Sequence, residues 1–369
     1  MLEETLECPA GHFSLQRPGS NDKSLRAWDA ADEYLISHIT ENLTNSPLAI
    51  FNDQFGTLGC ALNEQIQFWA SDSYCATQAL NLNLSHNQSS STVETHNALA
   101  APVCSAEKPL TAVIKLPKNL SFFEHQLQLC FKNGIQQVLI AGMMKHLPKN
   151  ILSLLQQYGQ VNRLPFKKKA TIFQLELSQS KESQYPKLNQ FEGITLSSEA
   201  NVFGRDKLDP GAQFFLQNIK QLPKAEYVAD LCCGSGILGL KYTEIFKPSS
   251  MHFYDESQMA VHSCENSWKL NQEDESTQGQ FFWNDGIPDN NSTRYDLILC
   301  NPPFHEQHTV GDHIAKRLFK DAKNNLGKGG QLIVVGNRHL GYHQTLKAYF
   351  KHVKLMANNQ KFVIISAYD

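Results

Sequence analysis

Short apolar runs that end in polar residues follow one another along the second half of the chain. They lie at residues 226–231, 251–254, 281–283 and 297–300. Continuous apolar runs of this kind predict strands that are buried on both faces, as in a parallel sheet. A helical stretch begins near Ile237, directly after the first run and a glycine turn. Strands that alternate with helices predict an α/β fold with a mostly parallel sheet.

The first half repeats this pattern in a weaker form. An apolar run at 48–51 stands where the second half has 226–231, and a run at 112–118 stands where it has 297–304. The distance along the chain from an acidic strand end to a later proline differs by only two residues between the copies, Asp72 to Pro117 and Asp255 to Pro302. Internal repetition of this kind predicts two tandem domains of the same fold.

Length and composition agree with two domains. The chain has 369 residues, which is long for a single core. Residues 178–184 are polar and lack an apolar period, as in a linker. We therefore predict a first domain at residues 1–180, a linker at 181–195 and a second domain at 196–369.

Charge and cysteine content exclude several classes of protein. The net charge of −3 gives no overall nucleic-acid signature. No apolar run approaches the roughly 18 residues that a membrane span needs, and the acidic Met1–Glu4 lacks the basic and apolar regions of a signal peptide. Nine cysteines without a Cys-x-x-Cys spacing argue against a disulfide framework and a zinc site. We expect a reduced cytoplasmic protein without a membrane segment.

A glycine turn follows the first strand of the second half. The sequence runs from Asp230 through two cysteines to Gly234 and Gly236, and a helix comes next. Strand, glycine turn and helix bring backbone N–H groups close to a ligand, although the third glycine of a dinucleotide fingerprint is missing. A carboxylate before the turn would face a pyrophosphate unfavourably, so Asp230 suits a ligand with a cationic amino-acid end.

Polar residues also end the next two strands. Asp255 follows by about twenty residues, at the position that accepts hydrogen bonds from ribose hydroxyls in such folds. Asn284 and Asp285 end the third strand, and either could contact an adenine.

The fourth strand ends in Asn301-Pro302-Pro303-Phe304. The asparagine oxygen and a proline-flanked carbonyl can each accept an N–H of a planar amino group, and the phenylalanine can stack on the ring that carries it. The alternative is an ordinary strand exit, where two prolines stop the strand. Nearby His305, His308 and His313 could suggest a metal, but no regular spacing fixes them as ligands, and we expect none.

These motifs resemble class I S-adenosylmethionine-dependent methyltransferases that act on nitrogen. Further segments across both halves are similar to the ribosomal RNA large subunit methyltransferase G family: residues 13–18, 27–35, 208–215 and 337–340. The resemblance implies two tandem Rossmann-like domains, a degenerate first and a catalytic second, with a seven-stranded sheet closed by an antiparallel strand. It implies methylation of a guanine 2-amino group in large-subunit (23S) ribosomal RNA.

The resemblance also implies roles for the motif residues. Asp230, Cys233, Gly234 and Gly236 would hold the methionine end of S-adenosylmethionine. Asp255 would bind its ribose, and Asp285 or Asn284 its adenine. Asn301, Pro302 and Phe304 would grip the guanine, with Asn301 also beside the cofactor. Asn201, Phe203 and Gln213 would shape the cofactor entrance.

The first half would then serve RNA binding rather than chemistry. Gln54 and Phe55 would fill the cofactor space, and Lys115 and Lys118 replace the asparagine and the stacking ring. Residues 108–169 hold ten lysines and arginines and the single acid Glu124. This surplus of positive charge could neutralise RNA phosphates. We name Lys115, Lys118, Lys167, Lys168 and Lys169 as RNA-contacting candidates. The alternative is that these lysines coat solvated surfaces or guard an edge strand against aggregation.

Other functions remain open from the sequence alone. They include methylation of a small-subunit guanine, of a protein glutamine or of adenine, and a non-enzymatic role in ribosome assembly. The strand-rich, lysine-bearing first half argues against a glutamine methyltransferase, which typically carries a helical first domain. The intact motif set argues against an inactive assembly factor. Tandem domains make a monomer plausible.

Overall fold

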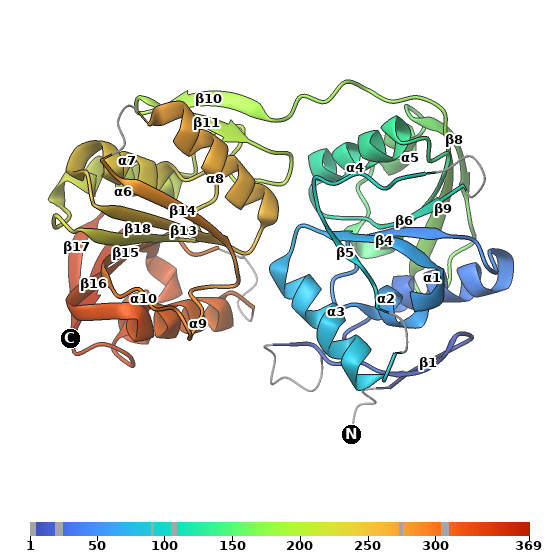
Figure 1. The fold of residues 1–369 in the computed structure, drawn as a ribbon, viewed down its shortest axis with the longest axis horizontal. Helices are drawn as coiled ribbons and strands as arrows, with labels where there is room; N and C mark the ends of the chain where they lie inside the picture. The colour runs from blue at the N-terminus through green and yellow to red at the C-terminus, as the bar shows by residue number, and fades with distance from the viewer. Residues whose placement is uncertain (1–4, 19–24, 90–91, 105–108, 273–275, 304–309) are drawn as a thin grey trace. The chain divides into compact units, whose positions relative to one another are not determined.

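The computed structural model describes residues 5–18, 25–89, 92–104, 109–272, 276–303 and 310–369. The chain divides into two compact units, Met1–Ser183 and Gln184–Asp369. Figure 1 shows an α/β layer arrangement in each unit. Phe304, His305 and His308 lie outside the described residues.

The second unit is built on a seven-stranded sheet in the order β14-β13-β12-β15-β16-β18-β17. The first five of these strands are parallel to one another, and β18 runs antiparallel to both β16 and β17. The strands are β12 (Tyr227–Leu231), β13 (Ser250–Asp255), β14 (Gln278–Trp283), β15 (Tyr295–Cys300), β16 (Leu326–Asn337), β17 (His352–Asn358) and β18 (Phe362–Tyr368). The predicted seven-stranded, mostly parallel sheet with a closing antiparallel strand is confirmed.

Helices cover both faces of this sheet, which explains why its strands read as continuous apolar runs. Alternate strand residues such as Val228 and Leu297 pack with α6 (Pro210–Asn218), α7 (Ile237–Phe246) and α8 (Gln258–Asn271). Their neighbours, such as Ala229 and Ile298, pack on the other side with α9 (Val310–Asn325) and α10 (Tyr342–Leu346). The core of the unit therefore lies in two layers, one on each face of the sheet.

A hairpin begins the second unit inside the predicted linker. Strands β10 (Lys187–Phe191) and β11 (Ile194–Ser198) pair antiparallel around a turn at Glu192 and Gly193, both with positive φ. The backbone of β11 is held to α8, because the Ser197 amide donates to the Ser267 hydroxyl at 2.9 Å. Residues 187–191, which fall within the predicted linker, form a strand.

The first unit repeats the fold of the second. Its sheet has the order β5-β4-β3-β6-β7-β9-β8, with β9 antiparallel to both of its neighbours. Its strands are β3 (Leu48–Phe51), β4 (Ile66–Ser71), β5 (Thr95–Asn97), β6 (Thr111–Lys115), β7 (Gln137–Met143), β8 (Gly159–Arg163) and β9 (Ala170–Leu177). Its helices are α1 (Ala30–Asn42), α2 (Thr57–Ala61), α3 (Tyr74–His86), α4 (Leu120–Lys132) and α5 (Ile151–Leu155), and a separate hairpin joins β1 (Thr5–Cys8) to β2 (Gly11–Ser14). The prediction of two tandem Rossmann-like domains is confirmed.

The bend after the first strand begins and ends with the same left-handed backbone in both units. Gly56 and Gly236 each precede a helix with left-handed φ values of 74° and 87°. Asn52 and Cys232, four residues earlier, also have positive φ, at 61° and 64°. The middle of the bend differs, because Gly234 has a φ of 55° and Gln54, its counterpart, is not among the residues with positive φ. The first unit therefore keeps the two ends of the bend but carries Gln54 and Phe55 within it.

Candidate active site

Four polar segments meet at the carboxyl edge of the second sheet. They follow β12, β13, β14 and β15, which are neighbours in the order β14-β13-β12-β15. The chain passes from β12 outward to β14 and then returns to β15 on the other side of β12. Such a reversal of strand order creates a crevice at the carboxyl ends, where ligands bind in open α/β sheets. The glycine bend, Asp255, Asn284 and Asn301 all lie at this edge.

Gly236 makes the closest approach between the bend and the rest of the unit. A Cβ atom at this position would lie 2.5 Å from the Cys264 Sγ atom of α8. Its left-handed φ is also strained for any residue with a side chain. A glycine is therefore required here, and the bend holds the start of α7 close to the crevice.

Asp255 holds the bend in place from the neighbouring strand. Its Oδ2 atom accepts a hydrogen bond from the Gly234 amide at 2.9 Å, and its Oδ1 atom accepts from the Ser257 amide at 2.9 Å. The carboxylate thus lies between the glycine bend and the start of α8. This is the position from which an acidic residue at the end of a second strand can also meet ribose hydroxyls.

Asp230 is buried below the bend rather than in it. Its Oδ2 atom accepts from the Gly239 amide at 2.9 Å, while its Oδ1 atom has no hydrogen-bond partner among the described residues. Burial, reinforced by the nearby Asp255 charge, raises the pKa of Asp230 to about 7, although the Gly239 hydrogen bond opposes the shift. A carboxylate that is unpaired in this way fits a site that meets a cationic group when a ligand is bound.

We expect Asp230→Asn to stabilise the ligand-free protein at neutral pH by up to about 4 kcal/mol, because a pKa raised by about three units costs about 1.4 kcal/mol per unit. The folded-state pKa is raised, so the unfolded chain loses its proton first as pH rises, and Asp230 makes the fold less stable between about pH 4 and pH 7. The advantage of the variant should therefore grow across this window and be absent near pH 3. Urea unfolding from pH 3 to pH 8 measures it. A constant difference across the window would contradict the assignment.

The end of β14 is tied to α9. Arg317 donates from Nη2 to the Asp285 carboxylate and from Nη1 to the Asp285 backbone oxygen, the latter at 2.7 Å. Asn284 donates its side-chain amide to Gly286 O at 2.9 Å. Both side chains that are predicted to contact the adenine therefore have a partner in the protein, Asp285 an ion pair and Asn284 a hydrogen bond.

Asn301 lies at the end of β15 with its amide oriented by a distant carboxylate. Its Nδ2 atom donates to Asp209 Oδ2 at 3.5 Å, and its Oδ1 atom is buried without a partner among the described residues. Asp209 is itself fixed, because it caps α6 by accepting from the Ala212 amide at 3.0 Å. Because the nitrogen of the Asn301 amide faces the Asp209 carboxylate, the oxygen is the end of the amide that can accept a hydrogen bond from a ligand. The next residue, Pro302, is buried.

Asp209 was missed as a site residue in the sequence, although a signal for its local role was present. An Asp followed by Pro is a recognisable helix start, with the side chain as cap and the proline in the first turn. Nothing in the sequence places that cap beside Asn301, which lies 92 residues away. Folding brings the two together.

Cys233 is placed differently from the other predicted cofactor residues. Its side chain is buried in the core near Cys264, and its amide donates to Tyr254 O at 3.0 Å. Burial raises the pKa of the Cys233 thiol, so the sulfur stays protonated and inert. Its structural role is to shape the bend.

The first unit has a lysine where the second has Asn301. Lys115 ends β6 as Asn301 follows β15, and its Nζ atom contacts Asp29 Oδ1 at 2.9 Å and Asp32 Oδ1 at 2.7 Å. Asp29 caps α1 as Asp209 caps α6. The Lys115 side chain is only 16% exposed. Its selection as an RNA contact is corrected, because its charge is buried and already matched by two carboxylates.

The other lysine candidates of the first unit are at its surface. Lys168 forms an ion pair with Glu33 at 2.7 Å, and Lys167 lies over the Tyr34 ring at 4.9 Å from its centre. Lys168 and Lys169 have positive φ values in the turn before β9. Lys118 and Lys169 are also exposed. These four remain candidates for contact with phosphates.

The helices and the side-chain clusters of the described residues bear on membrane and metal binding. Within the described ranges, no helix has the length and apolar character needed to cross a bilayer. The described part of the chain also contains no group of three His, Cys, Asp or Glu side chains that could hold a metal ion.

The residues at the crevice fit S-adenosylmethionine. Gly236 keeps the bend free of side chains, Asp230 offers an unpaired buried carboxylate oxygen, and Asp255 stands at the ribose position. Asn301 adds a further buried acceptor, its Oδ1 atom, that has no partner among the described residues. A cofactor crevice with a neighbouring acceptor for an amino group defines a methyltransferase of the class I fold.

Comparisons with known proteins place the chain within that class. Residues 193–366 match the model of the methyltransferase small domain, and residues 3–179 match the RLMG N-terminal domain. The ribosomal RNA large subunit methyltransferase G of Pseudoalteromonas translucida is 36% identical over 96% of this chain and 95% of its own length. The protein of the same name from Yersinia enterocolitica is 37% identical over 96% of this chain and 92% of its own. The chain belongs to the ribosomal RNA large subunit methyltransferase G family.

A solved structure supports the two-domain fold. It is a 16S rRNA N2 methyltransferase from T. Thermophilus in complex with AdoMet and guanosine, with a TM-score of 0.77 and 17% identity. The match covers 99% of this chain and 97% of that chain, so both units are included. At 17% identity, this similarity is evidence for a shared fold alone.

Proposed function

We propose that this protein transfers a methyl group from S-adenosylmethionine to the 2-amino group of a guanine in large-subunit (23S) ribosomal RNA. The observation that carries the proposal is the Asn301 amide, whose oxygen is buried and unpaired while its nitrogen is held by Asp209. An amino group with two N–H donors is the ligand that this acceptor fits. The names of the relatives support ribosomal RNA as the substrate.

The guanine amino nitrogen is a poor nucleophile, because its lone pair is delocalised into the ring. Asn301 Oδ1 would accept one of its N–H groups and the Pro302 carbonyl the other, which returns electron density to the nitrogen. When bound, S-adenosylmethionine supplies an electrophilic methyl group. Asp230, the glycine bend and Asp255 would hold it, so that positioning and electrostatics provide most of the rate. The amino proton becomes acidic as the nitrogen–carbon bond forms, and no strong base is needed beforehand.

Three further roles complete the proposal. Asn284 would contact the adenine, and Phe304 would stack on the guanine. Surface lysines of the first unit, Lys118 and Lys167–Lys169, would contact RNA phosphates. Because the substrate is ribosomal RNA, we place the protein in the cytoplasm, where it would act as a monomer of two domains split near residues 181–195.

Incubation with methyl-labelled cofactor and separate acceptors tests this function. The acceptors are large-subunit RNA, small-subunit RNA, DNA and a peptide-chain release factor, each purified from cells that lack the enzyme. We expect label in large-subunit RNA at a level that saturates near one methyl group per molecule. Label in another acceptor, with none in large-subunit RNA, would reject the proposal.

A further inference from the structure

The last sixty residues of the chain differ in charge from the residues before them. From residue 310 onward there are ten lysines and arginines but three aspartates and no glutamate. The preceding 309 residues hold 23 basic and 33 acidic residues. Ten positive and three negative charges give a formal charge of +7 after residue 310, against −10 before it. The basic segment forms α9, β16, α10, β17 and β18, all within the catalytic unit.

Helix α9 presents one basic face to solvent. His313, Lys316, Lys320 and Lys323 are separated by three, four and three residues, the spacing that places side chains on one face of a helix. The first three are exposed, whereas Leu318 and Phe319 on the opposite face are buried in the core. Among the described residues, Lys316 and Lys320 form no ion pair. These charges are not needed to hold the helix in place.

The basic face of α9 leads from one edge of the sheet to the other. The helix begins nine residues after Asn301, at the carboxyl edge, and ends at Asn325, directly before β16 starts at the amino edge. Sixteen residues of helix span about 24 Å. The row of charges therefore starts beside the candidate active site and continues to the opposite edge.

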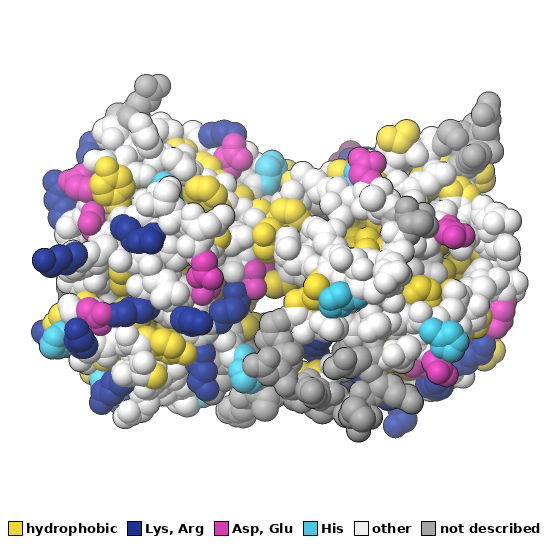
Figure 2. All heavy atoms as spheres, turned by 60° about the horizontal axis from the view of Figure 1, so that its bottom comes forward, with side chains coloured by type: hydrophobic (Ala, Val, Ile, Leu, Met, Phe, Trp, Pro, Cys, Tyr) yellow, Lys and Arg dark blue, Asp and Glu magenta, His cyan; other side chains and the backbone are white. Residues whose placement is uncertain are grey.

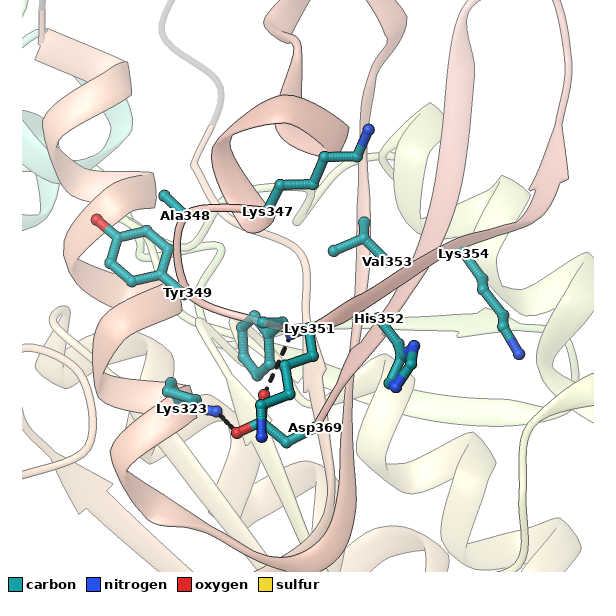
Figure 3. Close-up of a pocket in the computed structure, with 10 residues that line it drawn as sticks. Lys323, Lys347, Ala348, Tyr349, Lys351, His352, Val353, Lys354 and Asp369 are labelled. Atoms are coloured by element: carbon teal, nitrogen blue, oxygen red, sulfur yellow. Dashed lines mark hydrogen bonds and ion pairs between the residues drawn. The ribbon is translucent and has the colours of Figure 1, made fainter.

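At the amino edge the row joins a basic groove. The groove has a volume of about 700 Å³ and is lined by Lys323, Lys347, Tyr349, Lys351, His352, Lys354 and Asp369, among others. Figure 3 shows that these side chains come from the end of α9, the segment after α10 and the start of β17, and that Asp369, which follows β18, lies among them. Asp369, which pairs with Lys323, is the one acid lining the groove, so four lysines face a single side-chain carboxylate.

The lysines of the groove are available to a ligand. Lys347, Lys351 and Lys354 are exposed, and none of them forms an ion pair among the described side chains. Lys354 Nζ instead lies over the Tyr368 ring, 5.2 Å from its centre. The pKa of Lys323 is lowered by partial burial and by the neighbouring Lys351 charge, as expected where like charges gather. Figure 2 shows dark blue side chains gathered on the unit at the left of the view.

We propose that the exposed face of α9 and the groove at the start of β17 form one phosphate-binding track that holds the RNA backbone on the catalytic unit. The track consists of His313, Lys316, Lys320, Lys323, Lys347, Lys351, His352 and Lys354. The basic residues of α9, from His313 to Lys323, extend over about 15 Å of helix, and the groove continues them. Such a row suits a chain of phosphates and gives affinity without reading sequence. The inference rests on the proposed RNA substrate and adds a second RNA-binding surface to the lysines of the first unit.

Matched triple variants test the track. Lys316→Gln, Lys320→Gln and Lys354→Gln remove three charges from it. Lys220→Gln, Lys247→Gln and Lys269→Gln remove three exposed charges from the segments around α6, α7 and α8, which cover the other face of the same sheet. Both variants should keep the unfolding temperature and the cofactor affinity of the unaltered protein, which shows that each is folded.

We expect the track variant to bind large-subunit RNA about 10- to 100-fold more weakly at 0.1 M salt, and the control within about threefold. The slope of log affinity against log salt should fall by about 2–3 for the track variant, since each lost phosphate contact lowers it by roughly 0.7–0.9. At saturating RNA its kcat should be unchanged. Equal RNA affinity in the two variants would overturn the track.

The same experiment separates the track from the proposed function. If the protein labels no large-subunit RNA but the track variant alone loses RNA affinity, the proposed substrate is wrong and the track stands. If it labels that RNA and both variants bind it equally, the function stands and the track is wrong. Tighter track-dependent binding to phosphatidylglycerol vesicles than to RNA would also overturn the inference, because the surface would then serve a membrane.

Discussion

Asn301→Ala is expected to lower kcat by about ten- to a hundredfold while leaving the dissociation constant of S-adenosylmethionine within about threefold. The substitution removes the buried Oδ1 acceptor, and the loss of one such hydrogen bond in the transition state costs roughly 1–3 kcal/mol. Single-turnover methylation of RNA measures the rate, and calorimetric titration measures cofactor binding.

Two further variants make this result specific. Asn218→Ala removes an asparagine of the same unit whose side chain donates to Phe214 O and accepts from Gln221 Nε2, both local contacts at the end of α6, and it should leave kcat unchanged. Asp209→Ala should lower kcat but less than Asn301→Ala, because it frees the amide to rotate without removing it. Equal loss of rate and cofactor affinity in Asn301→Ala would mean that Asn301 holds the cofactor rather than the guanine.

Gly236→Ala is expected to lower the free energy of unfolding by about 2–5 kcal/mol and to weaken cofactor binding. Two costs add: a left-handed φ of 87°, worth about 1–2 kcal/mol, and a Cβ placed 2.5 Å from Cys264 Sγ, worth about 1–3 kcal/mol. Urea unfolding with and without S-adenosylmethionine measures both effects.

The turn of the first hairpin in the second unit supplies a control for Gly236. Gly193 has a φ of 85°, but no atom lies within 4 Å of a Cβ built on it, so Gly193→Ala should cost only about 1–2 kcal/mol. Cys264→Ala should restore part of the stability that Gly236→Ala loses, because it removes the sulfur that the new methyl group meets. If Gly193→Ala and Gly236→Ala were equally destabilising and Cys264→Ala gave no recovery, close packing of the bend would be refuted.

Much of the fold could be predicted because its parallel strands are buried on both faces. Such strands read as continuous apolar runs, and the residues that follow them must lie at one edge of the sheet. This is why Asp255, Gly236 and Asn301 could be grouped before any coordinates. The repeat was visible for the same reason, since both units keep the order of apolar runs even where the chemistry differs.

Other features depend on contacts between distant residues and left little trace in the sequence. Lys115 reads as a surface cation, yet folding buries it against Asp29 and Asp32. Asp209 reads as a helix cap, and its contact with Asn301 arises only in the folded unit. The spacing of the basic residues in α9 could predict one basic face on that helix. That this face continues into the groove could not be predicted, because it depends on the position of the start of β17 in the folded unit.

The most direct measurement is the identity of the methylated nucleoside. Large-subunit RNA methylated by the protein would be digested to nucleosides and analysed by liquid chromatography and mass spectrometry beside authentic standards. The account predicts N2-methylguanosine with the unaltered protein and its near absence with Asn301→Ala. A product methylated on adenine or on a ring nitrogen, or N2-methylguanosine at the same rate in Asn301→Ala, would contradict it.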